Sequence, residues 1–127
     1  MQIITVESSA ITPSIKFDAS QGKLAIKGVS VPENAVDFYK TLTESLEQYA
    51  SNPKPVTVVD ILLEYCNTAS TRCLLTILRC LEGIHRKGNE VTINWYYEED
   101  DEDMRDAGED YQSIVKLAFN IQQAKTD

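Results

Sequence analysis

The sequence has 127 residues, of which 43% are hydrophobic and 25% are charged, a balance typical of one globular domain spanning residues 1–127. The formal net charge of −8 argues against nucleic acid as a partner, because phosphate backbones bind basic surfaces. The longest apolar stretches, Val58-Val59 and Ile61–Leu63, are separated by Asp60, so no segment reaches the roughly 20 apolar residues of a membrane span. The N-terminus lacks the basic and apolar regions of a secretory signal, and we expect a cytoplasmic protein without membrane insertion.

The cysteines argue against a metal or redox site. Three are present, Cys66, Cys73 and Cys80, and the only histidine is His85. An odd number of cysteines without an export signal is typical of free thiols in a reducing compartment. No C-x-x-C pair occurs and His85 lies beyond all three cysteines, so we predict neither a metal ion nor a cofactor. The thiols are expected to be structural and to pack like small core side chains.

The first half of the sequence predicts a β-hairpin and then a helix. Over residues 14–28 apolar and polar residues alternate on both sides of a turn at Ser20–Lys23, where a glycine supplies the positive φ that tight turns need. Asn34 is a good N-cap for the helix, and the two prolines within residues 51–55 end it. The apolar residues at helical spacing in this helix are Phe38, Leu42, Leu46 and Tyr49.

A central strand and a second helix are predicted next. Residues 56–63 are a near-continuous aliphatic run in which Asp60 is the only charge, a pattern that favours a strand covered on both faces of a sheet. The polar segment 64–70 leads into an amphipathic helix, which ends at the cations His85–Lys87 and at Gly88. The apolar stripe of this helix consists of Leu74, Ile77, Leu78, Leu81 and Ile84.

The last third of the chain alternates again before it becomes acidic. Residues 91–97 predict a strand with Trp95 in the core. The acidic run 98–103 is interpreted as a solvated surface or a helix start, because no glycine falls where a calcium-binding loop requires one. Recognition of a basic partner by this run is an alternative that the sequence leaves open. Residues 104–115 predict a helix, and residues 117–121 an extended edge segment.

The order of these elements predicts the fold class. It runs strand, strand, helix, strand, helix, strand, helix, so that two strand–helix–strand crossovers follow one another. Such crossovers imply a mixed, mostly parallel sheet of about four strands with helices packed on it. The sequence therefore predicts a single α/β domain.

The turn from the central strand into the second helix carries the functional hypothesis. Asn67, Thr68, Ser70 and Thr71 are four capping residues in five positions, more than one helix start requires. A phosphate on a hydroxyl here would lie at the positive end of the helix dipole and near unpaired amides. It would also add about −1.5 to −2 charges to one place on the surface. The simpler interpretation is that Asn67 or Thr68 only caps the helix.

This turn resembles the signature of STAS-type anti-sigma-factor antagonists. In that family a strand bearing an aspartate leads through Asp-Ser-Ser-Gly into a helix, and the first serine after the turn aspartate is phosphorylated. In the alignment with residues 60–70, Asn67 stands at the family's aspartate, Thr68 at the phosphorylated serine, and Ala69-Ser70 at Ser-Gly. The resemblance implies a STAS-like domain with a switch at Thr68, whose neighbours would be Asp60, Asn67, Ala69, Ser70 and Thr71.

Three segments together are similar to the SiaC family of regulatory phosphoproteins, which look like divergent STAS domains. They are Pro32–Asn34, Tyr65–Ser70 and Asn94–Tyr97, in the order and spacing of the predicted elements. The similarity implies a threonine that a partner kinase phosphorylates and a partner phosphatase resets. It also implies that the unphosphorylated form binds and activates a diguanylate cyclase, in c-di-GMP signalling that controls biofilm formation or aggregation. Carried over to this sequence, the modified residue is Thr68.

The sequence favours a regulatory adaptor over an enzyme. His85 is expected at the opposite end of the second helix from Thr68, so the two cannot form a nucleophile and base pair. The five glycines do not cluster, which excludes a Gly-rich phosphate loop. Two alternatives stay open: an unmodified protein-interaction or small-ligand-binding module in which Thr68 is only a helix cap, and a small enzyme that uses the acidic run with a metal.

Overall fold

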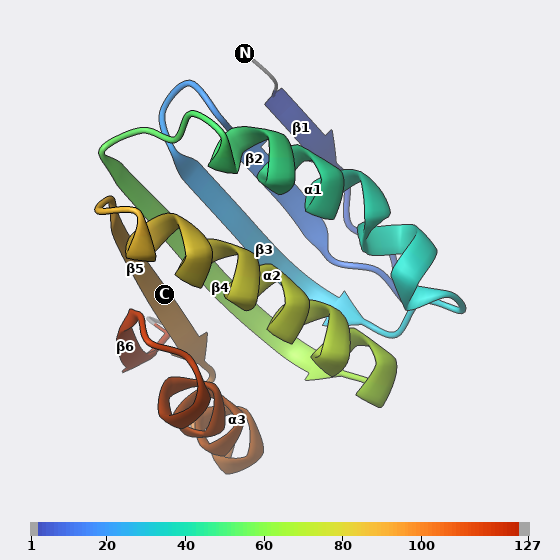
Figure 1. The fold of residues 1–127 in the computed structure, drawn as a ribbon. Helices are drawn as coiled ribbons and strands as arrows, with labels where there is room; N and C mark the ends of the chain where they lie inside the picture. Colours follow the sequence, from blue (N-terminus) through green and yellow to red (C-terminus); the bar gives the residue numbers. More distant parts are fainter. Residues whose placement is uncertain (1–2, 125–127) are drawn as a thin grey trace.

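Six strands and three helices make up residues 3–124, the part of the chain that the computed structural model describes (Figure 1). The strands stand in the sheet in their sequence order; β1–β2 and β2–β3 pair antiparallel, and the other three pairs are parallel. The predicted mixed, mostly parallel α/β fold is thus confirmed. The elements are β1 (Ile3–Val6), β2 (Ser14–Asp18), β3 (Lys23–Ser30), α1 (Ala35–Ala50), β4 (Val56–Cys66), α2 (Thr68–Arg86), β5 (Glu90–Tyr97), α3 (Glu102–Ile114) and β6 (Ala118–Gln123).

The sheet has two more strands than the four predicted, and both lie at its edges. β6 pairs with β5, in agreement with the predicted extended segment 117–121. β1 was not predicted, because the alternation of its four residues is short and weak. In the structure even Ile3 is 62% exposed. An edge strand has one neighbour and buries little, so its sequence carries little of the pattern that marks central strands.

All three helices cover the same face of the sheet (Figure 1). Phe17 packs edge-on against Tyr49 of α1, and Trp95 packs against Tyr111 of α3. The side chains of this face form two rows in register across the sheet, which are Phe17, Leu24, Val59, Ile93 and Phe119, and Ile15, Ile26, Ile61, Trp95 and Ile121.

Among residues 3–124 no helix covers the second face of β4, and the prediction of a strand buried on both faces is wrong. Val58, Asp60 and Leu62 point to this open face and are half-buried. Branched aliphatic side chains favour strands through their backbone preferences and through contacts with neighbours on the same face. A run of them therefore predicts a strand more reliably than it predicts burial on both sides.

Local signals for helix ends and turns are confirmed. Asn34 caps α1 by accepting a hydrogen bond from the Asp37 amide. Gly22 in the hairpin turn and Gly88 after α2 have φ of 67° and 104°, values that glycine adopts without steric cost. One detail of α1 differs from the prediction. Phe38 was expected in the core, but it is only partly buried, and its neighbour Tyr39 is fully buried instead.

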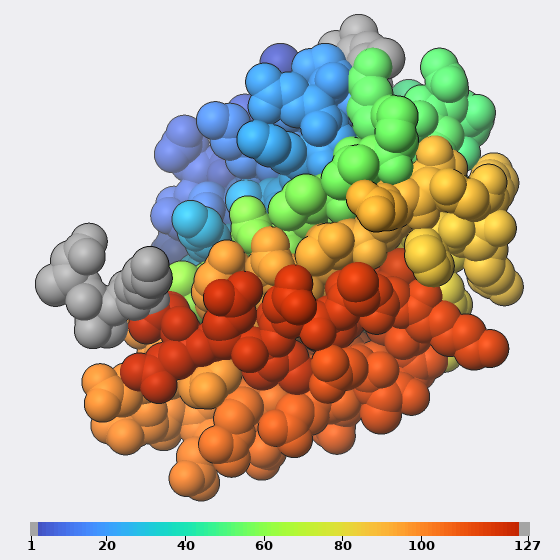
Figure 2. Space-filling model, turned by 90° about the vertical axis from the view of Figure 1, so that its left-hand side faces the viewer, coloured from blue at the N-terminus to red at the C-terminus, as the bar shows by residue number. Residues whose placement is uncertain are grey.

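Trp95 fixes α3 against the sheet and is fully buried, as predicted. Its indole Nε1 donates to the Met104 carbonyl at 2.9 Å. The helix begins within the acidic run, where Asp101 is the N-cap and accepts from the Met104 amide, so the interpretation of the run as a helix start is confirmed. α3 lies beside β6, and the two form one continuous surface on this side of the molecule (Figure 2).

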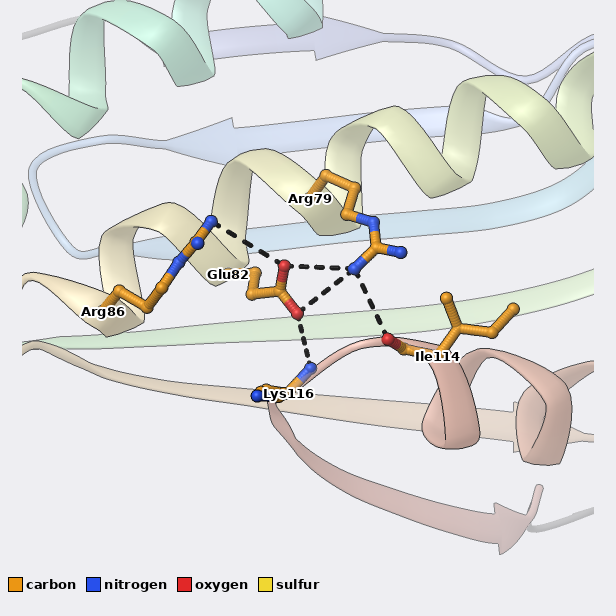
Figure 3. A network of polar contacts seen from close by, with 5 residues as sticks. All are labelled: Arg79, Glu82, Arg86, Ile114 and Lys116. Carbon is orange, nitrogen blue, oxygen red and sulfur yellow. Dashed lines mark hydrogen bonds and ion pairs between the residues drawn. The ribbon is translucent and has the colours of Figure 1, made fainter.

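Glu82 joins α2 to the loop between α3 and β6 (Figure 3). The carboxylate is buried, with Oε2 accepting from the Lys116 amide at 2.6 Å. Arg79 donates to both carboxylate oxygens and to the Ile114 carbonyl, and Arg86 lies 3.9 Å from Oε1. The Lys116 amide, more than the Arg79 guanidinium, lowers the pKa of Glu82 below its ordinary value of 4.5.

Replacing Glu82 with glutamine is expected to lower the melting temperature by several degrees at neutral pH. Since the folded-state pKa lies below 4.5, the stabilisation is present above that pH and is lost as the pH falls through the folded-state pKa. The variant should therefore lose less stability on acidification than the wild type, as measured by thermal melts across pH. Glu90→Gln, at an exposed position, is the control, and equal behaviour of the two variants would contradict this role.

Candidate functional site

The candidate switch lies where β4 ends and α2 begins. Cys66 is the last residue of β4, Asn67 the N-cap and Thr68 the first residue of α2. The carboxyl ends of the parallel strands β3, β4 and β5 meet at this end of the sheet, which in open α/β sheets is where ligands and partners commonly bind. The amino ends of α1 and α2 also lie at this end (Figure 1).

Asn67, not Thr68, caps α2. The Asn67 side chain accepts from the Ser70 amide at 2.8 Å, and its carbonyl accepts from the Thr71 amide at 3.0 Å. Of the two residues that the sequence offered as the cap, Asn67 takes this role, and Thr68, as the first residue inside the helix, does not.

The three hydroxyls of the first turn have different surroundings. Ser70 is fully buried, and its Oγ accepts from Ser30 at 2.8 Å. Thr71 is exposed, but its Oγ1 donates to the Asn67 carbonyl at 3.1 Å. Thr68 is exposed, and no hydrogen bond joins its hydroxyl to another residue of the described range 3–124. Of the three, Thr68 alone presents a free hydroxyl to solvent.

A buried polar network holds this turn against β3 and α1. The Ser30 hydroxyl lies 2.6 Å from the Tyr39 hydroxyl and donates to Ser70, so that one chain of hydrogen bonds links all three elements. Burial raises the pKa of Tyr39 to about 12, and the phenol therefore stays neutral at physiological pH. Fully satisfied buried networks of this kind rigidify their surroundings.

A second tyrosine fixes the turn from the side of α3. The Tyr111 hydroxyl donates to the Thr71 carbonyl at 2.8 Å. Sequence reasoning missed Ser30, Tyr39 and Tyr111. Ser30 and Tyr111 each lie 40 residues from the residue of the turn that they contact, and Tyr39 reaches the turn only through Ser30. Nothing in the local pattern around these residues distinguishes them from ordinary core positions.

The thiol beside the switch is not activated. Cys66 is half-buried, and desolvation raises the pKa of its thiol above the ordinary value of 9.0. All three cysteines are free. Within residues 3–124 no group of three or more histidine, cysteine, aspartate or glutamate side chains could hold a metal ion, and no helix in this range is long and apolar enough to cross a membrane.

Asp60, which the family resemblance grouped with Thr68, lies apart from Thr68 in the structure. It lies on the open face of β4, six residues before Cys66, which is roughly 20 Å along an extended strand. There Asp60 accepts from Asn94 at 2.9 Å, and Asn94 accepts from Asn120 at 3.1 Å. The carboxylate is thus satisfied in a polar row across the uncovered face of the sheet, and it need not be explained by a functional role.

Comparison with known proteins assigns the chain to a family. The model of the SiaC family of regulatory phosphoproteins matches residues 6–124. The chain belongs to the SiaC family. An uncharacterized protein of Pseudomonas aeruginosa strain UCBPP-PA14 is 27% identical to it over 122 residues, which are 96% of this chain and 97% of that protein.

Solved structures agree with this membership. SiaC of Pseudomonas aeruginosa is 26% identical, with a TM-score of 0.89 over 98% of this chain and 100% of its own. The SiaC chain in a crystal structure of the diguanylate cyclase SiaD with its activator SiaC is also 26% identical, with a TM-score of 0.89 over 95% and 99% of the two chains. The family that the three short segments of sequence predicted is thus confirmed, including its character as a regulatory phosphoprotein family.

Proposed function

We propose that this SiaC-family chain is a phosphorylation-switched adaptor that binds and activates a diguanylate cyclase when Thr68 is unphosphorylated. A partner kinase would modify Thr68 and a partner phosphatase would reset it, in the cytoplasm and without catalysis by the chain itself. Support for the cyclase comes from the Pseudomonas relative that activates SiaD. The observation that carries the choice of Thr68 is its free, exposed hydroxyl beside one buried and one hydrogen-bonded hydroxyl.

The start of α2 favours an anion at this position. The amides of Thr68 and Ala69 are the first two of the helix and have no acceptor within it. A phosphate on Thr68 would lie beside them at the positive end of the helix dipole, where negative charge is stabilised. The folded protein can therefore carry the modification without an electrostatic penalty from its own backbone.

Phosphate at Thr68 would act by changing the surface rather than by refolding the turn. Ser70 and Thr71 are held from β3, α1 and α3 by the networks through Ser30 and Tyr111. Tyr65, three residues before Thr68 at the end of β4, is 60% exposed. A partner that covers both Tyr65 and position 68 would have to strip water from a dianion, which is costly.

Mass spectrometry of the chain purified from its native cells, with and without phosphatase treatment, tests the site. The expected result is a single phosphate that maps to Thr68 and disappears on phosphatase treatment. A phosphate on Ser70 would contradict the proposal, because that hydroxyl is buried and bonded in the folded protein. A chain that stays unmodified across growth conditions would favour the unmodified interaction module instead.

The partner is tested by affinity purification from the same cells. We expect a diguanylate cyclase to co-purify with the chain that carries Thr68→Val, which cannot be phosphorylated. That cyclase, purified by itself, is called the cognate cyclase below. Addition of the unphosphorylated chain should raise its rate of c-di-GMP synthesis. Absence of any effect on a cyclase that binds would limit the function to tethering.

A further inference from the structure

A pocket of about 220 Å³ opens between β4, α2 and α3, and Thr71 and Cys66 lie on its wall, within a helical turn of Thr68. We call it the anchor pocket. Its floor is apolar and consists of Leu74, Trp95, Met104, Ala107 and Tyr111. Its rim carries three carboxylates, which belong to Glu64, Asp101 and Asp103.

We propose that the anchor pocket binds an arginine or lysine side chain of the partner that docks at Thr68. The aliphatic stem would lie on Trp95 and Met104, and the cationic head would reach the carboxylates of Glu64 and Asp103. Long basic side chains combine these two properties, since they bury their methylene groups on apolar surface while the charge stays at the rim. The inference rests on the proposed function and adds to it the chemistry of the contact.

Charge complementarity identifies this occupant. No lysine or arginine lines the pocket. Glu64 and Asp103 are exposed and take part in no salt bridge among residues 3–124, while Asp101 is engaged in capping α3. An apolar side chain would fill the floor but leave both carboxylates unpaired at the edge of an interface. An acidic side chain would meet like charges, which are repulsive.

The contact with Asp103 and the proposed switch at Thr68 lie on different helices. Asp103 belongs to α3, whereas the α2 wall is lined by Thr71 and Leu74, and Thr68, at the start of α2, is not among the lining residues. A partner segment whose basic side chain enters the pocket would pass over the end of β4 and the first turn of α2, where Tyr65 and Ala69 are exposed. The segment would then remove water from a phosphate at Thr68, although Thr68 itself does not line the anchor pocket.

Charge reversal at the rim tests the proposal by titration against the cognate cyclase at low and physiological salt. Glu64→Lys combined with Asp103→Lys should weaken binding at least about tenfold and reduce its dependence on salt. The control is Glu47→Lys combined with Glu90→Lys, which changes the net charge equally at exposed positions outside the pocket. It should bind within about twofold of the wild type. Equal effects of the two double variants would overturn the proposal.

Filling the floor is an independent test. Ala107→Leu places a larger side chain in the pocket and should weaken binding by a similar factor, whereas Ala118→Leu, on exposed β6, should not. Thermal melts of each variant establish that it is folded. The wild-type chain and the Thr68-phosphorylated chain are measured in the same assay. Their comparison separates the anchor pocket from the proposed switch at Thr68. If phosphate abolishes binding but the rim and floor variants bind like wild type, only the anchor pocket is overturned; if the wild type does not bind, both proposals fail.

Discussion

Phosphorylation of Thr68 is expected to lower the affinity for the cognate cyclase by at least about 100-fold, or about 3 kcal/mol. Thr68 is exposed at the first residue of α2, three residues after the exposed Tyr65 at the end of β4. A partner that covers this surface must remove water from a dianion, and the networks that fix Ser70 and Thr71 prevent the turn from moving away. Isothermal titration of the phosphorylated and phosphatase-treated chain measures the difference.

Substitutions at Thr68 separate charge from shape. Thr68→Val keeps the size of the side chain and should bind like wild type, while Thr68→Glu adds one charge and should bind about tenfold more weakly, less than the effect of a full phosphate. Thr41→Glu is the matched control, because Thr41 is an exposed threonine that belongs to α1 and not to α2. Unchanged binding of the phosphorylated chain would show that Thr68 lies outside the interface.

Gly108→Ala is expected to destabilise the fold by about 2 kcal/mol or more, although alanine is the better helix former. A Cβ on Gly108 would lie 2.7 Å from Nε1 and 2.9 Å from Cγ of Trp95. The indole cannot yield easily, since it is fully buried, bonded to the Met104 carbonyl and packed against Tyr111. Urea unfolding monitored by tryptophan fluorescence measures the loss directly.

The same substitution in α2 is the control for this prediction. A Cβ on Gly83 would meet nothing within 4 Å. Gly83→Ala should therefore stabilise the protein by about 0.5–1 kcal/mol, through the gain in helix propensity alone. The two substitutions are chemically identical, so opposite signs would isolate the contact with Trp95. Stabilisation by both would mean that α3 can shift away from the sheet at little cost.

The sequence by itself determined the features that depend on residues a few positions apart. Asn34 caps α1, and Gly22 and Gly88 adopt positive φ, because these properties follow from the residue and its immediate neighbours. The alternation and helical spacing of apolar residues likewise predicted the hairpin, the central strands and the three helices. The family followed from short segments such as Tyr65–Ser70, whose order matched these elements.

Only the tertiary structure decided which of the neighbouring hydroxyls is available. Ser70 and Thr68 look alike in the sequence, yet Ser70 is buried and accepts a hydrogen bond from Ser30, 40 residues earlier. Tyr111 reaches the Thr71 carbonyl over another 40 residues. The face that Asp60 occupies and the pairing of β1 were decided in the same way. Burial and hydrogen bonding at these positions depend on strands and helices that the chain brings together only when it folds, and no local pattern carries that information.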